Sequence, residues 1–517
     1  MSFFQARKRV KCMRKNGILL PITSLPSPWG VGTLGKEAYS FVNFLNGSGQ
    51  TYWQILPINP TSYGDSPYQS YSTFAGNPYF IDLDLLAGNG LLNQNEYDWL
   101  DWDTEKDKVD YGFLYNHRFN VLKLAVDRFL ENPDPEYVEF LENNADWLDD
   151  YALFMALKNK HEGKAWWDWD EKYKFYSPEK AEEWKEELKE DYEFYRVLQF
   201  FFTKQWNALK KYANDKGVEI IGDLPIYVAR DSVDVWAHPE YFELDEDLNP
   251  KRVAGCPPDA FSADGQLWGN PLYNWSNQRE DGFKWWIDRI DYATKLYDIV
   301  RIDHFRGFDS YYAIPYEDDT ARNGEWVDGP GIDLFKAVED SIGKKKIIAE
   351  DLGFLTPSAK DLLKNTKFPG MKILQFAFDS RDSANGEYYP FNYPENSVAY
   401  TGTHDNDTIM GWVNTAHPDD VQLAMDYMDL QDPKNMNWAM IREVMKSPSN
   451  YSILTAQDLV GLGSESRMNV PSRLGGNWQW RLLPGQLDDA IQQKLLHLTK
   501  LYKRFPIEAE KEEKTAQ

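Results

Sequence analysis

Three acidic residues follow short apolar segments of the chain: Asp303 after YDIVRI, Glu350 after KKIIA, and Asp405 after SVAYTGTH. A set of carboxyl groups gathered at one rim suits glycoside chemistry, in which one carboxylate attacks the anomeric carbon and another carboxyl protonates the departing oxygen. In enzymes that retain the anomeric configuration, these two groups lie about 5–5.5 Å apart. A third acid can stabilise the distorted, cationic sugar ring.

Neighbouring residues could give these acids different protonation states. Arg301 lies two residues before Asp303, so both side chains are expected on the same side of a strand. The guanidinium could then keep Asp303 ionised, as a nucleophile requires. Glu350 follows an apolar run, and partial burial there would raise its pKa, as a general acid requires. A single acid after a strand is often only a helix N-cap, and Asp351 and Asp407 fit that role too.

The three acids lie at the ends of strand-like segments that recur along the chain. These segments are near-continuous apolar runs, which are typical of strands buried on both faces of a parallel sheet, and helix-like stretches lie between many of them. They cover residues 17–26, 51–60, 218–229, 297–307, 345–353, 371–379, 397–408 and 451–462. The pattern predicts an α/β fold, a (β/α)8 TIM barrel whose active site lies at the carboxyl ends of the strands. A doubly wound sheet is the alternative, because periodicity alone does not establish closure.

Unequal spacing of the segments predicts insertions into the barrel. A largely helical insertion is expected between the second and third strands, because that stretch is rich in amphipathic helical sequence. The predicted units are a first barrel part (1–86), the helical insertion (87–200), the third-strand region (201–229), a loop subdomain covering the active site at the C-terminal face (230–278), the rest of the barrel (279–507) and a flexible tail (508–517).

The charge and residue composition of the chain argue against several classes of binding partner and cofactor. A net charge of −26 on 517 residues argues against nucleic acid and anionic membranes as partners. The two cysteines, Cys12 and Cys256, exclude a disulfide scaffold. We find no signal-peptide core or membrane span, and therefore expect a cytoplasmic protein. Neither H-E-x-x-H nor C-x-x-C occurs, so we expect neither a catalytic metal nor a cofactor, while a structural calcium ion stays open.

One glycine motif is discounted. Residues 30–35 match G-x-G-x-x-G, but they follow prolines and no acidic residue lies about 20 residues further on to bind a ribose. We interpret the segment as a flexible loop at the barrel rim. An NAD-linked dehydrogenase would rest on this motif alone.

Several longer segments resemble the 4-α-glucanotransferases known as amylomaltases or disproportionating enzymes, relatives of the α-amylase superfamily. The resemblance runs over nearly the whole chain. The segments that carry it are SPWGVGTLG (27–35), WQILPINPTSYGDSPYQSYSTFAGNP (53–78), GDLPIYVARDSVDVW (222–236), GCPPDAFSADGQLWGNPLYNW (255–275), RIDHFRG (301–307), AEDLG (349–353), GTHDNDT (402–408) and NWQWRL (477–482).

The resemblance implies a role for each acid. Asp303 is expected to be the nucleophile, Glu350 the general acid/base and Asp405 the stabiliser of the transition state. It also implies a set of residues that contact sugar, namely Ser66, Tyr68, Asp223, Asp259, Trp268, Arg301, His304 and His404.

The expected function is therefore transfer of a segment of a 1,4-α-D-glucan to the 4-hydroxyl of an acceptor glucan or glucose, by retaining double displacement. Maltooligosaccharides and other 1,4-α-glucans are the expected partners, and the oligomeric state stays open. An α-glucan hydrolase using the same three carboxylates is the first alternative. An inactive glucan-binding protein is the second, although it predicts a broken set of acids.

Overall fold

The computed structural model describes most of the chain. The described residues are 14–62, 64–102, 105–258, 262–353, 355–381, 385–471, 473 and 475–505. Cys12 and the predicted tail at 508–517 lie outside this part.

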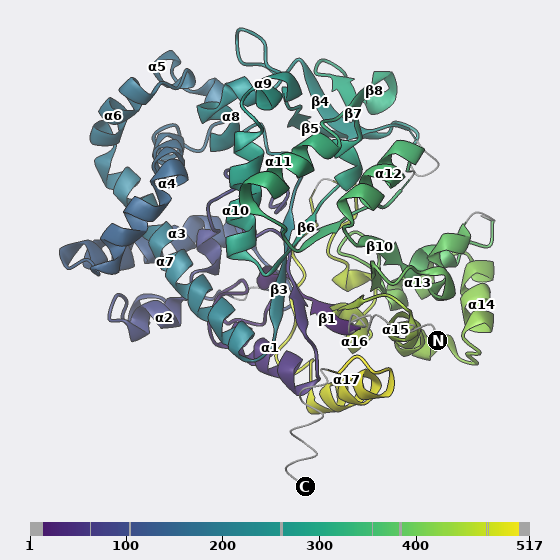
Figure 1. The fold of residues 1–517 in the computed structure, drawn as a ribbon. Helices are drawn as coiled ribbons and strands as arrows, with labels where there is room; N and C mark the ends of the chain where they lie inside the picture. The colour runs from purple at the N-terminus through teal and green to yellow at the C-terminus, as the bar shows by residue number, and fades with distance from the viewer. Residues whose placement is uncertain are drawn as a thin grey trace, which may run out of the picture.

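Eight parallel strands form the centre of the molecule (Figure 1). Their order in the sheet is β10-β11-β12-β1-β2-β3-β6-β9, so each strand lies beside the next one along the chain, without the reversal typical of a doubly wound sheet. The bounds are β1 Lys15–Leu19, β2 Tyr52–Gln54, β3 Glu219–Leu224, β6 Ile299–Ile302, β9 Ile347–Ala349, β10 Gly370–Ile373, β11 Ser397–Tyr400 and β12 Tyr451–Thr455. All eight predicted strands are confirmed.

The sheet closes between β9 and β10. The amide of Ala349, at the end of β9, donates a hydrogen bond to the carbonyl of Pro369, just before β10, at 3.0 Å. The carboxylate of Asp351 accepts a bond from the amide of Met371 on β10 at 2.6 Å. These contacts join the two ends of the sheet, which confirms the predicted TIM barrel.

Residues of the strands alternate between two apolar cores, as the period of two in a strand requires. One core fills the barrel lumen and consists of Leu19, Tyr52, Ile221, Ile299, Ile348, Met371, Ile373, Val398, Tyr400 and Ile453. Their chain neighbours, such as Ile220 and Val300, belong to the larger core beneath the helices. A residue two positions beyond a lumen residue therefore points toward the lumen as well.

Helices cover the outside of the barrel. Those around it are α1 Lys36–Gly47, α10 Lys284–Leu296, α11 Ile332–Ile342, α12 Pro357–Thr366, α13 Ile409–Thr415, α15 Met436–Lys446, α16 Ala456–Val460 and α17 Asp489–Leu501, while α14 Pro418–Tyr427 lies at the outer edge of the molecule (Figure 1). Strict strand–helix alternation fails at one place, because the described residues between β10 and β11 form only short 3-10 turns.

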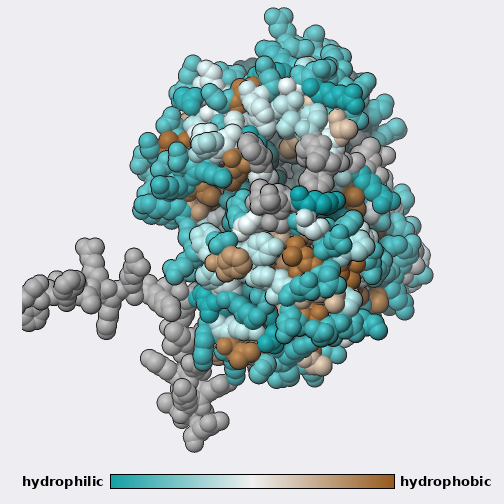
Figure 2. Space-filling view, turned by 90° about the vertical axis from the view of Figure 1, so that its right-hand side faces the viewer, coloured by the Kyte–Doolittle hydropathy of each residue, from teal (hydrophilic) through white to brown (hydrophobic). Residues whose placement is uncertain are grey.

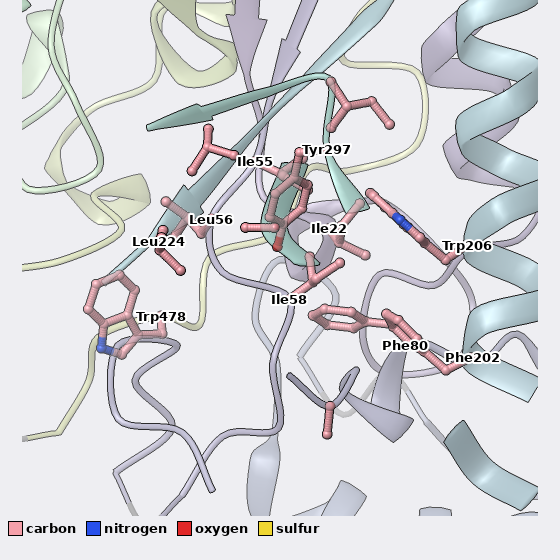
Figure 3. Packing of buried hydrophobic residues seen from close by; sticks show 14 of the residues in the cluster. Ile22, Ile55, Leu56, Ile58, Phe80, Phe202, Trp206, Leu224, Tyr297 and Trp478 are labelled. Carbon is pink, nitrogen blue, oxygen red and sulfur yellow. The ribbon is translucent and has the colours of Figure 1, made fainter. Parts of the chain in front are cut away.

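A group of helices between β2 and β3 extends to one side of the barrel (Figure 1). These helices are α2 Leu83–Gly88, α3 Tyr111–Glu131, α4 Glu136–Lys160, α5 Glu171–Lys174, α6 Pro178–Glu187 and α7 Lys189–Asp215. α7 continues through residue 200, where the sequence placed a boundary, and leads directly to β3. Figure 3 shows that Phe202 and Trp206 of α7 pack near Phe80 and Tyr297, which ties the group to the barrel core.

A small antiparallel sheet stands on the barrel, with strand order β5-β4-β7-β8. Its strands are β4 Arg252–Cys256, β5 Gln266–Pro271, β7 Ser310–Pro315 and β8 Glu325–Asp328, and α8 Val233–Ala237 and α9 Trp275–Glu280 flank the first two. The segment 230–278, predicted as a loop subdomain, includes the two strands β4 and β5. Half of this sheet comes from residues after β6, a long-range pairing that local sequence patterns do not reveal.

The glycine motif at 30–35 is not a flexible rim loop. Thr33 and Leu34 are fully buried. The hydroxyl of Thr33 donates to the carboxylate of Asp82 at 2.6 Å, and the amide of Leu34 donates to the carbonyl of Phe80 at 2.9 Å. The segment is instead bonded to residues that follow β2 and precede α2.

The face drawn in Figure 2 is mostly hydrophilic, with apolar residues in small, separate patches. This agrees with the excess of acidic residues. Among the described helices, none combines the length and the apolar character needed to cross a membrane.

Candidate active site

Arg301 lies at the centre of a cluster of carboxylates in the barrel lumen. β3 and β6 pair in a register that sets Asp223 opposite Arg301, and both residues continue the lumen faces of their strands. One guanidinium nitrogen of Arg301 donates to both oxygens of Asp223, at 2.7 and 2.6 Å. Both side chains are almost completely buried.

The same guanidinium also contacts two predicted catalytic acids. It lies 3.2 Å from Asp303, the next lumen-facing residue after β6, and 3.4 Å from Glu350, which follows β9. Asp303 and Glu350 therefore share one cation, and they retain partial access to solvent. The prediction that Arg301 contacts Asp303 is confirmed, but its shortest bonds are to Asp223, because those two residues lie opposite each other in the sheet.

Arg301, which contacts three carboxylates, does not lower the pKa of Asp303 below its usual value. Burial raises the pKa of Asp303 well above its usual value, the negative charge of Glu350 raises it further, and Arg301 only partly offsets these effects. The sequence-based expectation of a low pKa is thus wrong for the free site. The fold thus sets the charges of Asp303 and Glu350 against each other beside one guanidinium.

His304 couples the strand end of β6 to that of β9. Its backbone is left-handed, with φ at 45°, and its amide donates to Glu350 Oε2 at 2.5 Å. Burial lowers the pKa of the imidazole, which favours the neutral ring. The ring meets the indole of Trp268, on β5, edge to face at 5.0 Å between centroids. The small sheet therefore contributes an aromatic side chain to the site.

Tyr68 connects Asp223 to His404. Its hydroxyl lies 2.8 Å from Asp223 Oδ2 and 3.0 Å from Nε2 of His404. The one hydroxyl proton of Tyr68 is donated to Asp223, so the hydroxyl oxygen accepts from His404. The rings of Tyr68 and His404 stack at 5.2 Å. Loops after β2 and β11 thereby meet across the rim.

Asp405 lies in a turn beyond the end of β11. Its Oδ2 is 3.2 Å from Nε2 of His404, and 44 % of its side chain is exposed. Desolvation by the surrounding protein raises the pKa of Asp405, but His404, a hydrogen bond from Asn469 and the charge of Arg301 outweigh it and hold the pKa far below its usual value. Asp405 is therefore an accessible anion beside the Asp303–Glu350 pair.

Comparison with known proteins identifies the family that carries this arrangement. The family model described as 4-alpha-glucanotransferase matches residues 20–487, which include every barrel strand after β1 and all three acids. The chain belongs to the 4-alpha-glucanotransferase family.

Relatives within this family match along almost their whole length. A 4-alpha-glucanotransferase of Clostridium butyricum is 48% identical over 485 residues, covering 93% of this chain and 99% of the relative. That of Thermus thermophilus is 46% identical, covering 92% and 96%. Among solved structures, an amylomaltase from Streptococcus agalactiae in complex with acarbose is 43% identical, with a TM-score of 0.93, and covers 95% of this chain and 100% of its own.

Ser66 and Asp259 are the remaining residues that were predicted to contact sugar. The hydroxyl oxygen of Ser66 accepts a bond from the amide of Tyr68 at 3.3 Å, so Ser66 shapes the loop that presents Tyr68. Asp259 lies outside the described residues.

Two acids considered as helix N-caps are not caps. Asp351 bonds to β10, as described above, and Asp407 accepts from the hydroxyl of Ser464 at 2.6 Å. The cap of α13 is Thr408, whose hydroxyl oxygen accepts from the amide of Gly411.

Sequence reasoning did not single out two residues of the site. Trp478 lies close to Tyr68 and His404, with ring centroids 5.7 and 5.9 Å away. Asn469 donates to Asp405 Oδ1 at 2.6 Å. Trp478 lies in NWQWRL, one of the segments that resemble the family, so the sequence contained an indication of its role. Asn469 lies in no such segment and does not directly follow a strand, so nothing in the sequence indicated its role. Within the described residues, we find no group of three or more His, Cys, Asp or Glu side chains arranged to hold a metal ion.

Proposed function

We propose that the cluster around Arg301 carries out 4-alpha-glucan transfer by retaining double displacement, with Asp303 as nucleophile. The observation that carries the proposal is that Asp303 and Glu350 contact the same guanidinium, so an attacking oxygen and a proton donor lie side by side. The 1,4-α-glucans, including maltooligosaccharides, are the substrates. The cytoplasmic location expected from the sequence stays a prediction.

In the first step, an oxygen of Asp303 bonds to the anomeric carbon while the bond from that carbon to the departing glucan breaks. Glu350 gives its proton to the departing oxygen. Asp405 remains anionic and stabilises the positive charge that develops on the sugar ring. The product is a β-linked glycosyl-enzyme with Glu350 ionised.

In the second step, the 4-hydroxyl of an acceptor glucan attacks the anomeric carbon. Glu350 removes the hydroxyl proton, and the bond to Asp303 breaks. Two inversions restore the α configuration and the starting protonation state. Transfer exceeds hydrolysis when the acceptor outcompetes water, and Trp268 supports this by offering an aromatic face beside His304.

The product profile from maltotriose as sole substrate tests this proposal. We expect glucose together with a ladder of longer maltooligosaccharides, and we expect Asp303→Asn to reduce the rate by roughly 10³-fold or more. Glucose and maltose alone, with reducing ends increasing over time, would instead indicate a hydrolase. A fully active Asp303→Asn variant would contradict the assignment of the nucleophile.

A further inference from the structure

Asp405 is not held by a barrel strand. β11 ends at Tyr400, five residues earlier, and Asp405 lies in the turn that follows. Asp303 and Glu350, by contrast, come directly after β6 and β9. A carboxylate on a turn needs other contacts to keep one orientation, since stabilising a transition state requires charge that is fixed before the reaction.

A segment after β12 supplies backbone contacts to this turn. The amide of Asn469 donates to the carbonyl of His404 at 3.0 Å. Arg467 donates to the carbonyl of Asp405 at 2.6 Å and to the carbonyl of Asn469 at 2.7 Å. Because β11 and β12 are parallel neighbours in the barrel, the loops that follow them meet at the same rim.

The side chain of Asn469 adds a contact of a different kind. Its amide nitrogen donates to Asp405 Oδ1 at 2.6 Å, while His404 lies 3.2 Å from Oδ2. The two carboxylate oxygens thus contact different side chains, Asn469 at Oδ1 and His404 at Oδ2, and these two contacts limit rotation of the carboxylate. Asn469 is uncharged, so it orients the anion without neutralising it, whereas a lysine or arginine there would cancel charge that the sugar cation needs.

We infer that Asn469 is a positioning residue for the family reaction, which acts by fixing the carboxylate of Asp405 toward the sugar. The inference rests on the proposed role of Asp405. It extends the site to the segment Arg467–Asn469, which lies outside every strand-end motif.

Substitution of Asn469 by alanine removes only the side-chain hydrogen bond from Asn469 to Asp405. In Asn469→Ala, the backbone bonds to His404 and from Arg467 can remain, so the loop keeps its anchors. We expect kcat for maltotriose disproportionation to fall about 10- to 100-fold with little change in KM, because the lost interaction acts in the transition state. The acid limb of kcat/KM should stay in place, because Asp303, whose pKa is raised, sets it; a general disturbance of the cluster around Arg301 would move it.

Three further variants make the outcome decisive. Asn469→Asp keeps the size of the side chain, so it should fold, but it sets a carboxylate against Asp405; we expect a larger loss of kcat at neutral pH than in Asn469→Ala. Asn396→Ala, which removes an exposed amide bonded to the carbonyl of Lys367, should leave kcat unchanged. Asp405→Asn should be nearly inactive.

The inference is overturned if Asn469→Ala and Asn469→Asp keep the wild-type kcat while Asp405→Asn is inactive. An active Asp405→Asn would instead overturn the proposed function at Asp405, so the two failures are distinguishable.

Discussion

Arg301 and Asp223 face each other across β6 and β3 and form the shortest ion pair of the site, with both oxygens of Asp223 within 2.7 Å of one guanidinium nitrogen. This pair holds the guanidinium in place beside Asp303 and Glu350. The arginine can then serve as a fixed support for both acids.

Replacing Asp223 by asparagine tests this support. Burial and Glu350 are the main causes of the raised pKa of Asp303, and the charge of Asp223 adds to them. Asp223→Asn should therefore lower the pKa of Asp303 and move the acid limb of kcat/KM to lower pH. Loss of the buried pair should also reduce kcat/KM about 10- to 100-fold. A pH–rate profile checks both, and an acid limb that stays in place or rises would contradict the argument.

Asp303→Asn should make the folded protein more stable at neutral pH. The pKa of Asp303 is raised in the folded state, so wild-type stability falls as pH rises from about 4, the usual pKa of an unfolded aspartate. Asparagine has no such penalty. We expect a gain on the order of 1 kcal/mol at pH 7, or roughly 1 °C in Tm for a chain of this length, that shrinks toward zero near pH 4.

Thermal unfolding at several pH values measures this gain. Asp101→Asn, at an exposed position, is the control and should leave Tm unchanged. A gain that grows as the pH falls would show that the sign is wrong.

Tyr68→Phe should reduce activity without unfolding the protein. The change removes the bonds to Asp223 and His404 but keeps the ring that stacks on His404. We expect kcat/KM to fall about 10-fold, since a hydrogen bond to a charged group typically contributes about 1.5–3 kcal/mol, part of which water can replace. Tyr212→Phe, which removes a hydroxyl bonded to Asn43 on the surface, is the matched control. Equal rates for both variants would argue against a role of the Tyr68 hydroxyl.

Trp268→Ala should change how the glycosyl-enzyme partitions between acceptor and water. Without the indole beside His304, we expect the KM for acceptor sugar to rise about 10-fold and the hydrolysed share to increase. Free glucose and total transfer products, measured over time, give this ratio. Trp99→Ala, at a highly exposed position, should leave it unchanged, and an unaltered ratio in Trp268→Ala would remove Trp268 from the acceptor side.

Local sequence patterns predict the barrel strands but do not predict the strands of the small antiparallel sheet. A strand buried on both faces, such as Ile347–Ala349, must be apolar along its length, so the pattern is visible without a partner strand. β4 and β7 pair across about fifty residues of chain, and their short segments contain mixed polar and apolar residues. The prediction of a flexible loop at residues 30–35 is wrong for a similar reason, because only the packing of the folded chain shows that this segment is buried.

The sequence by itself determined that Arg301 and Asp303 share one face of a strand and that Glu350 ends another, because side-chain direction along a strand follows from the local period of two. Only the tertiary structure decided that Asp223 lies opposite Arg301, and that Asn469 reaches Asp405. Register between strands and contacts between loops depend on barrel closure and helix packing, which sum over the whole chain. The pKa of Asp303 followed the same rule: its strand neighbour suggested a low value, whereas burial and Glu350, brought in by the fold, raise it.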